Sequence, residues 1–276
     1  MKPVLGLAAL LAICGAQPAL ADAWSLPRSN VEEITAPDGH VYRLMTAWPE
    51  GEPPEAGWPV LWVLDGEDNF AIAVLTARRL ARAGARSGVR EGIVAAVDSR
   101  SLARRVEDYT PAVPGYDIPR GFPASGLTTG GAEAFLDLLE GPLRDRVARR
   151  WRLDPQRMVL MGHSFGGLLA LHTLFSGRDF SGVVAVSPSL WFGDGALRMA
   201  EDAARVRPLA RLLIASNSGD GGPDAASGAA AEALVERWRR KGHDAQYLSL
   251  PGQAHGSTML SSMTAAIAFT FAGDRP

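Results

Sequence analysis

Residues 158–171 read MVLMGHSFGGLLAL, and this segment decides the fold of the chain. Four apolar residues run into Gly-x-Ser-x-Gly, and a second apolar run of helix-forming residues follows at once. The pattern predicts a strand, a sharp turn and a helix, with Ser164 at the turn. In such a nucleophile elbow the serine backbone is strained, and Gly162 and Gly166 stand where a Cβ would clash with the crossing strand and helix. Ser164 is therefore the candidate nucleophile. The alternative is a glycine-rich turn whose serine has no role.

Strand and helix patterns alternate on both sides of this segment. Two alternating stretches, 31–34 and 41–47, flank Pro37-Asp38-Gly39 and predict an antiparallel hairpin at a sheet edge. Further strands are expected at 60–64, 93–97, 158–161, 183–186, 212–215 and 245–250. Helices are expected at 70–83, 132–150, 167–175, 196–206, 225–241 and 259–271. This order predicts an α/β fold in a single domain, with a mainly parallel, doubly wound sheet covered by helices on both faces.

The first residues have the features of a secretory signal. Lys2 gives a positive start, residues 4–16 are mostly apolar, and Ala19-Leu20-Ala21 fits a cleavage site, so residues 1–21 are expected to be removed and 22–276 to form the domain. A membrane anchor is the first alternative, but the apolar run is short for a span. Lipidation of Cys14 is the second, although the bulky Ile13 precedes it. We expect a periplasmic or secreted enzyme with no stable membrane association after cleavage.

Composition excludes several classes of function. Cys14 is the only cysteine, so a mature chain cleaved after Ala21 has no disulfide, thiolate nucleophile or zinc-cysteine site. The formal net charge of −2 gives no general field for nucleic acid, and we expect no nucleic-acid partner. Serine chemistry requires no cofactor and no metal, and we expect neither.

A serine hydroxyl needs a base, and His255 is the best candidate. It lies in Pro251-Gly252-Gln253-Ala254-His255-Gly256, directly after the last predicted strand, where a loop can bring an imidazole over the carboxyl edge of the sheet. The other histidines fit less well. His40 lies in the early hairpin, His172 lies in the helix after the elbow, and His243 precedes a strand.

The acid that would orient His255 should follow the preceding strand, and there the sequence leaves three possibilities. Asp220 is the better placed carboxylate of the loop 216–224. Asp224 is equally suited to cap the helix predicted from Ala225. The third possibility is a dyad of Ser164 and His255, with the imidazole held by backbone or water.

An oxyanion hole needs two amides aimed at the developing negative charge. The first is expected from Phe165, directly after the nucleophile. The second is expected from Glu67, because Asp65-Gly66-Glu67 begins the loop after strand 60–64 and Gly66 permits a sharp turn. The alternative for Asp65-Gly66 is an ordinary turn.

At these residues the chain resembles the putative-esterase branch of the α/β-hydrolases, and within it the periplasmic esterases that open trilactone catecholate siderophores such as enterobactin and salmochelin. The matching pieces cover most of the chain after the signal. They are WPVLWVLDG at 58–66, DYTP at 108–111, GGAEAFL at 130–136, GHSFGGL at 162–168, SPSLW at 187–191 and AHG at 254–256. The resemblance implies an α/β-hydrolase fold and a small-molecule ester substrate. A Ser/His pair without a clear acid occurs in that subgroup, which the resemblance adds in support of the dyad as an alternative to Asp220.

Three residues are candidates for contact with a substrate. Trp191 follows strand 183–186 at the same edge as Ser164 and is expected to form an aromatic wall, with core packing as the alternative. Arg104 and Tyr109 lie in the long segment 98–131, which has no clear periodicity and is a functional loop candidate. The arginines there are suited to an anionic or catecholate group, and solvated surface positions are the alternative.

These observations predict an exported serine carboxylic-ester hydrolase that works through an acyl-enzyme. Acyl transfer to an acceptor other than water uses the same elbow chemistry and is the second hypothesis. Hydrolysis of carbohydrate or feruloyl esters is a further alternative on the same fold. A non-catalytic binding protein on a hydrolase scaffold is the third class, and its signature would be loss of the nucleophile or the base.

Overall fold

The structure is a computed structural model that describes residues 24–122, 124–204, 206–217 and 225–273. The predicted signal at 1–21, with Cys14, lies outside these residues. So do both candidate acids, Asp220 and Asp224. No described helix combines the length and the apolar character that a membrane span requires.

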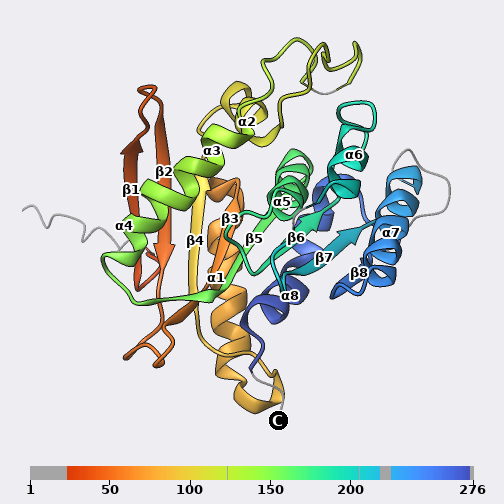
Figure 1. Ribbon diagram of the computed structural model, residues 1–276. Helices are drawn as coiled ribbons and strands as arrows, with labels where there is room; N and C mark the ends of the chain where they lie inside the picture. The colour runs from red at the N-terminus through yellow and green to blue at the C-terminus, as the bar shows by residue number, and fades with distance from the viewer. Residues whose placement is uncertain (1–23, 123, 205, 218–224, 274–276) are drawn as a thin grey trace, which may run out of the picture.

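A mostly parallel sheet runs through the described part of the chain (Figure 1). Its eight strands there follow the order β1-β2-β4-β3-β5-β6-β7-β8. The strands are β1 (Ser29–Thr35), β2 (Val41–Ala47), β3 (Trp58–Leu64), β4 (Ile93–Asp98), β5 (Leu153–His163), β6 (Gly182–Val186), β7 (Arg211–Ser216) and β8 (Ala245–Ser249). β1 and β2 form an antiparallel pair, β2 also pairs antiparallel with β4, and the neighbours from β4 to β8 are parallel. The doubly wound sheet with an N-terminal hairpin is confirmed.

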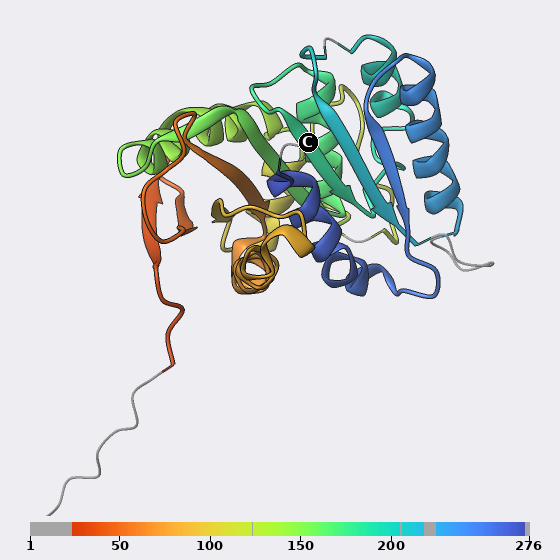
Figure 2. The same ribbon diagram turned by 90° about the horizontal axis from the view of Figure 1, so that it is seen from below.

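Helices cover both faces of the sheet, as Figure 2 shows from below. They are α1 (Gly66–Arg82), α2 (Leu102–Tyr109), α3 (Ala132–Leu138), α4 (Arg144–Ala148), α5 (Phe165–Phe175), α6 (Ala196–Asp202), α7 (Ala225–Arg240) and α8 (Thr258–Phe271). α1 and α8 contact each other on one face, and α3, α5 and α7 cover the other.

The central strand β3 divides the core between these two layers. Its side chains alternate: Val60, Trp62 and Leu64 belong to the cluster under α3 and α5, whereas Leu61 and Val63 belong to the cluster under α1 and α8. All seven residues of β3 are buried. A strand covered on both faces has to be apolar throughout, which explains the continuous run in the sequence.

Two predicted helices differ from the structure. The helix expected at 132–150 is interrupted by a π-helical segment, Leu139–Leu143, that contains Pro142. Proline has no N–H to donate and its ring displaces the preceding turn, so the regular bonding pattern cannot pass through it. The helix expected at 196–206 ends at Asp202.

The segment 98–131 is not wholly irregular, because it contains α2. Ser101 caps this helix: its side chain accepts a hydrogen bond from the amide of Arg104. The side of α2 that faces the protein carries the buried residues Val106, Asp108 and Tyr109. Two of these three can hydrogen-bond, so the apolar periodicity that marks other helices is weak here.

Candidate active site

The predicted elbow is present at the junction of β5 and α5. Ser164 has a φ of 60° and a ψ of −115°, a strained conformation for a residue with a side chain. Its amide donates to the carbonyl of Val186 over 2.9 Å, which ties the turn to β6. A Cβ on Gly162 would lie 2.4 Å from the backbone of Gly166, and a Cβ on Gly167 would lie 2.9 Å from the Val186 carbonyl oxygen. Gly162 and Gly167 are therefore required by close backbone approach. A Cβ on Gly166 would meet only side-chain atoms, with the Leu64 side chain nearest at 3.3 Å, which corrects the clash predicted for Gly166.

A second serine, Ser189, lies next to the nucleophile. Its Oγ is 3.4 Å from the Oγ of Ser164, and its amide donates to the Ser164 carbonyl over 3.1 Å. Ser189 is buried and follows β6. Ser189 was not predicted as a site residue, although it lies within the SPSLW motif at the carboxyl edge of the sheet.

The structure brings His255 to the elbow. His255 is exposed and begins the short helical turn η3 (His255–Ser257), just before α8. Its ring centroid lies 4.6 Å from that of His163, the residue before Ser164. His163 Nε2 donates to the backbone carbonyl of His255 over 2.8 Å. His163 at the end of β5 and His255 in the loop after β8 are 92 residues apart in the sequence, and this bond joins them. The predicted base and the predicted nucleophile therefore lie at one edge of the sheet.

The other three histidines considered as bases have partners away from the elbow. His172 Nε2 lies 2.6 Å from a carboxylate oxygen of Glu133 on α3, and His40 Nε2 lies 2.9 Å from the Ser99 carbonyl oxygen. The ring of His243 packs 4.6 Å from that of Trp238 on α7.

An arginine–carboxylate pair supports the elbow from the side of α2. Arg105 donates to Asp65 from Nε over 2.6 Å and from Nη2 over 2.8 Å, and Nη2 also reaches the His163 carbonyl at 3.2 Å. Asp65 has a φ of 55°, and its amide donates to the hydroxyl of Tyr109 over 3.2 Å. A bidentate pair of this kind fixes orientation as well as charge.

His163 is neutral near pH 7 in this environment. Burial is the main cause that lowers its pKa from 6.5 to about 4, and the neighbouring His255 contributes next. A neutral imidazole carries one N–H, and the bond to the His255 carbonyl places that proton on Nε2.

The two expected oxyanion amides differ in their surroundings. Phe165 is the first residue of α5, where amides have no acceptor within the helix, so the amide is suited to an oxyanion. The amide of Glu67 donates to Asp98 Oδ2 over 3.1 Å. Glu67 can serve as the second donor to the oxyanion only if its amide breaks the hydrogen bond to Asp98.

Residues 39–266 match the family described as "Putative esterase". The chain belongs to this family. The chain is 34% identical over 182 residues to a siderophore triacetylfusarinine C esterase of Aspergillus fumigatus, an alignment that covers 60% of this chain and 58% of that protein. This chain thus spans about three fifths of the length of the fungal relative. It is 28% identical over 238 residues to an apo-salmochelin esterase of Escherichia coli, covering 82% of this chain and 73% of the relative.

A solved structure confirms the fold of this esterase-family chain. The BES protein from Bacillus cereus superposes with a TM-score of 0.82 at 23% identity, covering 91% of this chain and 99% of that one. At that identity the likeness concerns the fold, so the roles of individual residues rest on the local geometry of this chain.

Trp191 lies in a cluster of aromatic side chains beside the elbow. Its ring centroid is 5.7 Å from that of Phe165 and 4.7 Å from that of Phe122, whose side chain is 44% exposed. Trp191 is half-buried and also packs on the core. This position fits both the expected pocket wall and core packing.

Arg104 and Tyr109 do not have the surroundings expected of substrate contacts. Tyr109 is fully buried, and its hydroxyl supports the Asp65 turn. Arg104 Nε donates to the Tyr42 hydroxyl and to Asp108 Oδ1, each over 2.8 Å, and its Nη1 pairs with Asp38. Asp108 is buried, and it also accepts hydrogen bonds from Ser99 and Tyr42. These bonds make both residues supports of the fold, and their contact with a substrate stays a prediction.

We expect Arg104→Leu to destabilise the protein by about 3 kcal/mol, because it leaves the buried Asp108 carboxylate without its cation. Urea unfolding measures the change. The double variant Arg104→Leu with Asp108→Asn should recover part of the loss, since the unpaired charge is then removed. Arg198→Leu, which breaks an exposed pair with Asp202, is the control and should leave the stability nearly unchanged, because solvent screens such a pair. An unchanged stability in Arg104→Leu, with weakened substrate binding, would contradict this structural role and favour contact of Arg104 with the substrate.

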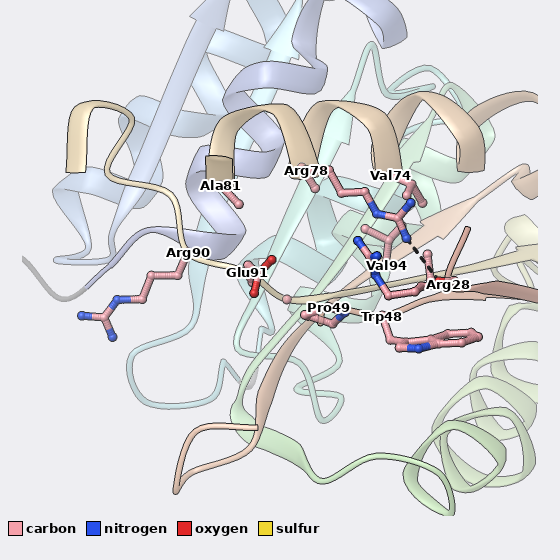
Figure 3. A pocket seen from close by; sticks show the side chains of 12 residues that line it. Arg28, Trp48, Pro49, Val74, Arg78, Ala81, Arg90, Glu91 and Val94 are labelled. Carbon is pink, nitrogen blue, oxygen red and sulfur yellow. Dashed lines mark hydrogen bonds between the residues drawn. The ribbon is translucent and has the colours of Figure 1, made fainter. Parts of the chain in front are cut away.

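Two cavities lie near the sheet. A groove of about 680 Å³ begins beside His163 and follows the carboxyl ends of β3 and β4, with Asp65, Asp98 and Arg105 in its lining. A smaller cavity of about 20 Å³, room for one water, lies under α1 at the opposite edge of the sheet (Figure 3). There Arg78 donates to the carbonyls of Pro27 and Arg28. Open parallel sheets bind ligands at the carboxyl ends of their strands, so the groove belongs to the candidate site.

Among the described residues, no group of three or more His, Cys, Asp or Glu side chains is placed to hold a metal ion.

Proposed function

We propose that this chain is an exported serine carboxylic-ester hydrolase that cleaves siderophore esters through an acyl-enzyme at Ser164. The observation that carries the proposal is the strained elbow of Ser164, with the loop of His255 bound to the adjacent His163. Membership of the esterase family supports ester chemistry. The siderophore esterases among its relatives support the substrate class.

In the proposed reaction the Oγ of Ser164 attacks the ester carbonyl while His255 takes its proton. The amide of Phe165 stabilises the oxyanion of the tetrahedral intermediate, and Glu67 is the proposed second donor. His255 then returns the proton to the departing alcohol, which leaves an acyl group on Ser164. Water repeats the sequence and releases the acid.

A substrate screen of the purified mature protein tests the proposal. The panel contains a trilactone catecholate siderophore, an ester-linked hydroxamate siderophore, short acyl esters, feruloyl esters and acetylated sugars. We expect a siderophore ester to give the highest kcat/KM. A preference for feruloyl or sugar esters would contradict the substrate class. Product analysis with an added alcohol tests hydrolysis, because ester formation with that alcohol would indicate acyl transfer.

We keep Asp220 as the proposed acid of a triad and expect Asp220→Asn to lower kcat by a factor on the order of 10⁴, because asparagine leaves the imidazole in the wrong tautomer. Steady-state kinetics measure the loss. Asp224→Asn is the matched control from the same loop and should retain activity, since asparagine caps a helix nearly as well as aspartate. If Asp220→Asn stays within about tenfold of wild type, Ser164 and His255 act as a dyad.

A further inference from the structure

We propose that His163 is a positioning residue that holds the loop of His255 against the elbow, so that the imidazole of His255 meets Ser164. This inference rests on the proposed function. It assigns a specific task to the residue between the first glycine and the serine of the Gly-x-Ser-x-Gly motif.

The contact fixes the backbone of His255 rather than its ring. His163 Nε2 lies 2.8 Å from the carbonyl oxygen of His255. The same oxygen accepts a hydrogen bond from Thr258 Oγ1 over 2.7 Å. Thr258 is buried, and its Oγ1 lies 2.9 Å from Ser187 Oγ, directly after β6. The carbonyl is therefore held from two sides, by the elbow and by the N-terminus of α8.

Most of the loop around His255 lies at the surface. Pro251, Gly252, Ala254, His255 and Gly256 are all exposed. A segment with little buried surface opens easily unless specific hydrogen bonds restrain it. The bond from His163 is therefore expected to contribute strongly to the position of this loop.

The backbone of His163 is held by β6 and by Arg105. It ends β5, where it lies opposite Val186 in the parallel register with β6. Its carbonyl accepts a hydrogen bond from Arg105, which is held by two bonds to Asp65. The resulting chain of contacts runs from α2 and the end of β3, through the elbow, to the loop of His255.

The role of His163 is geometric rather than electrostatic. The titratable groups that face it are His255 from η3, Arg105 from α2 and Asp65 from the turn before α1. With a pKa of about 4, His163 carries no charge between about pH 5 and 9, so its Nε2 donates as a neutral group throughout that range. Its removal should lower the rate without moving the pH profile.

The test compares His163→Leu, which removes the donor at similar volume, with His163→Gln, whose amide nitrogen stands near the position of Nε2. Misplacement of a catalytic group by about 1 Å costs about 100-fold, so we expect His163→Leu to lower kcat by about 10- to 100-fold, with KM within about threefold. His163→Gln should recover most of the rate. Hydrogen exchange in a peptide covering 251–258 should accelerate in His163→Leu alone.

His40→Leu is the matched control, because His40 Nε2 also meets a backbone carbonyl, that of Ser99, at 2.9 Å. It should leave kcat and exchange at 251–258 unchanged. The rate at which a fluorophosphonate probe labels Ser164 gives a second readout that needs no knowledge of the substrate. The labelling rate should fall in His163→Leu by about the same factor as kcat.

Four outcomes would overturn the inference: wild-type kcat in His163→Leu, unchanged exchange at 251–258, a glutamine variant as slow as the leucine variant, or a displaced acid limb of the pH profile. Failure of the proposed function has a different signature. In that case the wild-type protein itself is neither labelled by the probe nor active on any ester, and the inference fails with it.

Discussion

Replacing Ser164 with alanine is expected to lower kcat for ester hydrolysis by a factor on the order of 10⁴ to 10⁶. Without Oγ no acyl-enzyme forms, and only binding and the oxyanion amides remain to assist attack by water. The fold should be unaffected, because alanine keeps the Cβ at the same strained φ. Among the residues that the structure describes, the hydroxyl has a single long contact of 3.4 Å, with Ser189. We expect the free energy of unfolding to change by less than about 1 kcal/mol.

Steady-state kinetics on the best ester of the screen, with thermal unfolding in parallel, provide the measurement for Ser164→Ala. Ser176→Ala is the matched control, since Ser176 lies at the other end of α5 and its hydroxyl bonds the carbonyl of His172. It should retain wild-type kcat. Undiminished turnover in Ser164→Ala would end the proposal of a serine hydrolase.

The sequence was sufficient to predict the layers of the fold because burial imposes a regular pattern. Strand β3 is buried on both faces and is apolar throughout, and edge strand β1 alternates because one of its faces is more exposed. The elbow was equally predictable. Close backbone approach at Gly162 permits no side chain, so the geometry determines the residue directly; the second such position is Gly167 rather than the predicted Gly166.

The sequence was less informative where polar groups are buried. Helix α2 was missed because much of its inward face is polar: Asp108 is buried with Arg104 and Tyr42 rather than with apolar side chains. Such charges look like surface residues in a sequence, and only the tertiary structure supplies their partners. The same limit explains why the structural bonds of Arg104 and Tyr109 were not predicted.

Contacts between segments far apart in the chain also could not be predicted from the sequence. The first turn of α1 meets the end of β4 where the Glu67 amide donates to the side chain of Asp98, and no local sequence pattern indicates that bond. The position of Ser189 beside Ser164 depends on the register of β5 with β6. The bond between His163 and His255 likewise requires the loop after β8 to fold back over the elbow.

The second large effect is expected for His255→Ala, which should lower kcat about as much as loss of the serine, by a factor on the order of 10⁴ to 10⁶. The reason is that nucleophile and base act as a unit: without the imidazole, the Ser164 hydroxyl keeps its proton during attack and the leaving alcohol receives none. KM should change little, because His255 acts on the reacting atoms rather than on the body of the substrate.

His172→Ala is the contrasting variant, because this histidine bonds Glu133 on α3 and lies in the helix after the elbow. It should retain kcat and lose about 1 kcal/mol of stability, a modest value because the Glu133 side chain is 58% exposed. Kinetics and urea unfolding of the two variants form one experiment. If His172→Ala lost activity while His255→Ala kept it, the base would be wrongly assigned. The double variant Ser164→Ala with His255→Ala should be no slower than either single variant, since a unit that has lost one member has little further rate to lose.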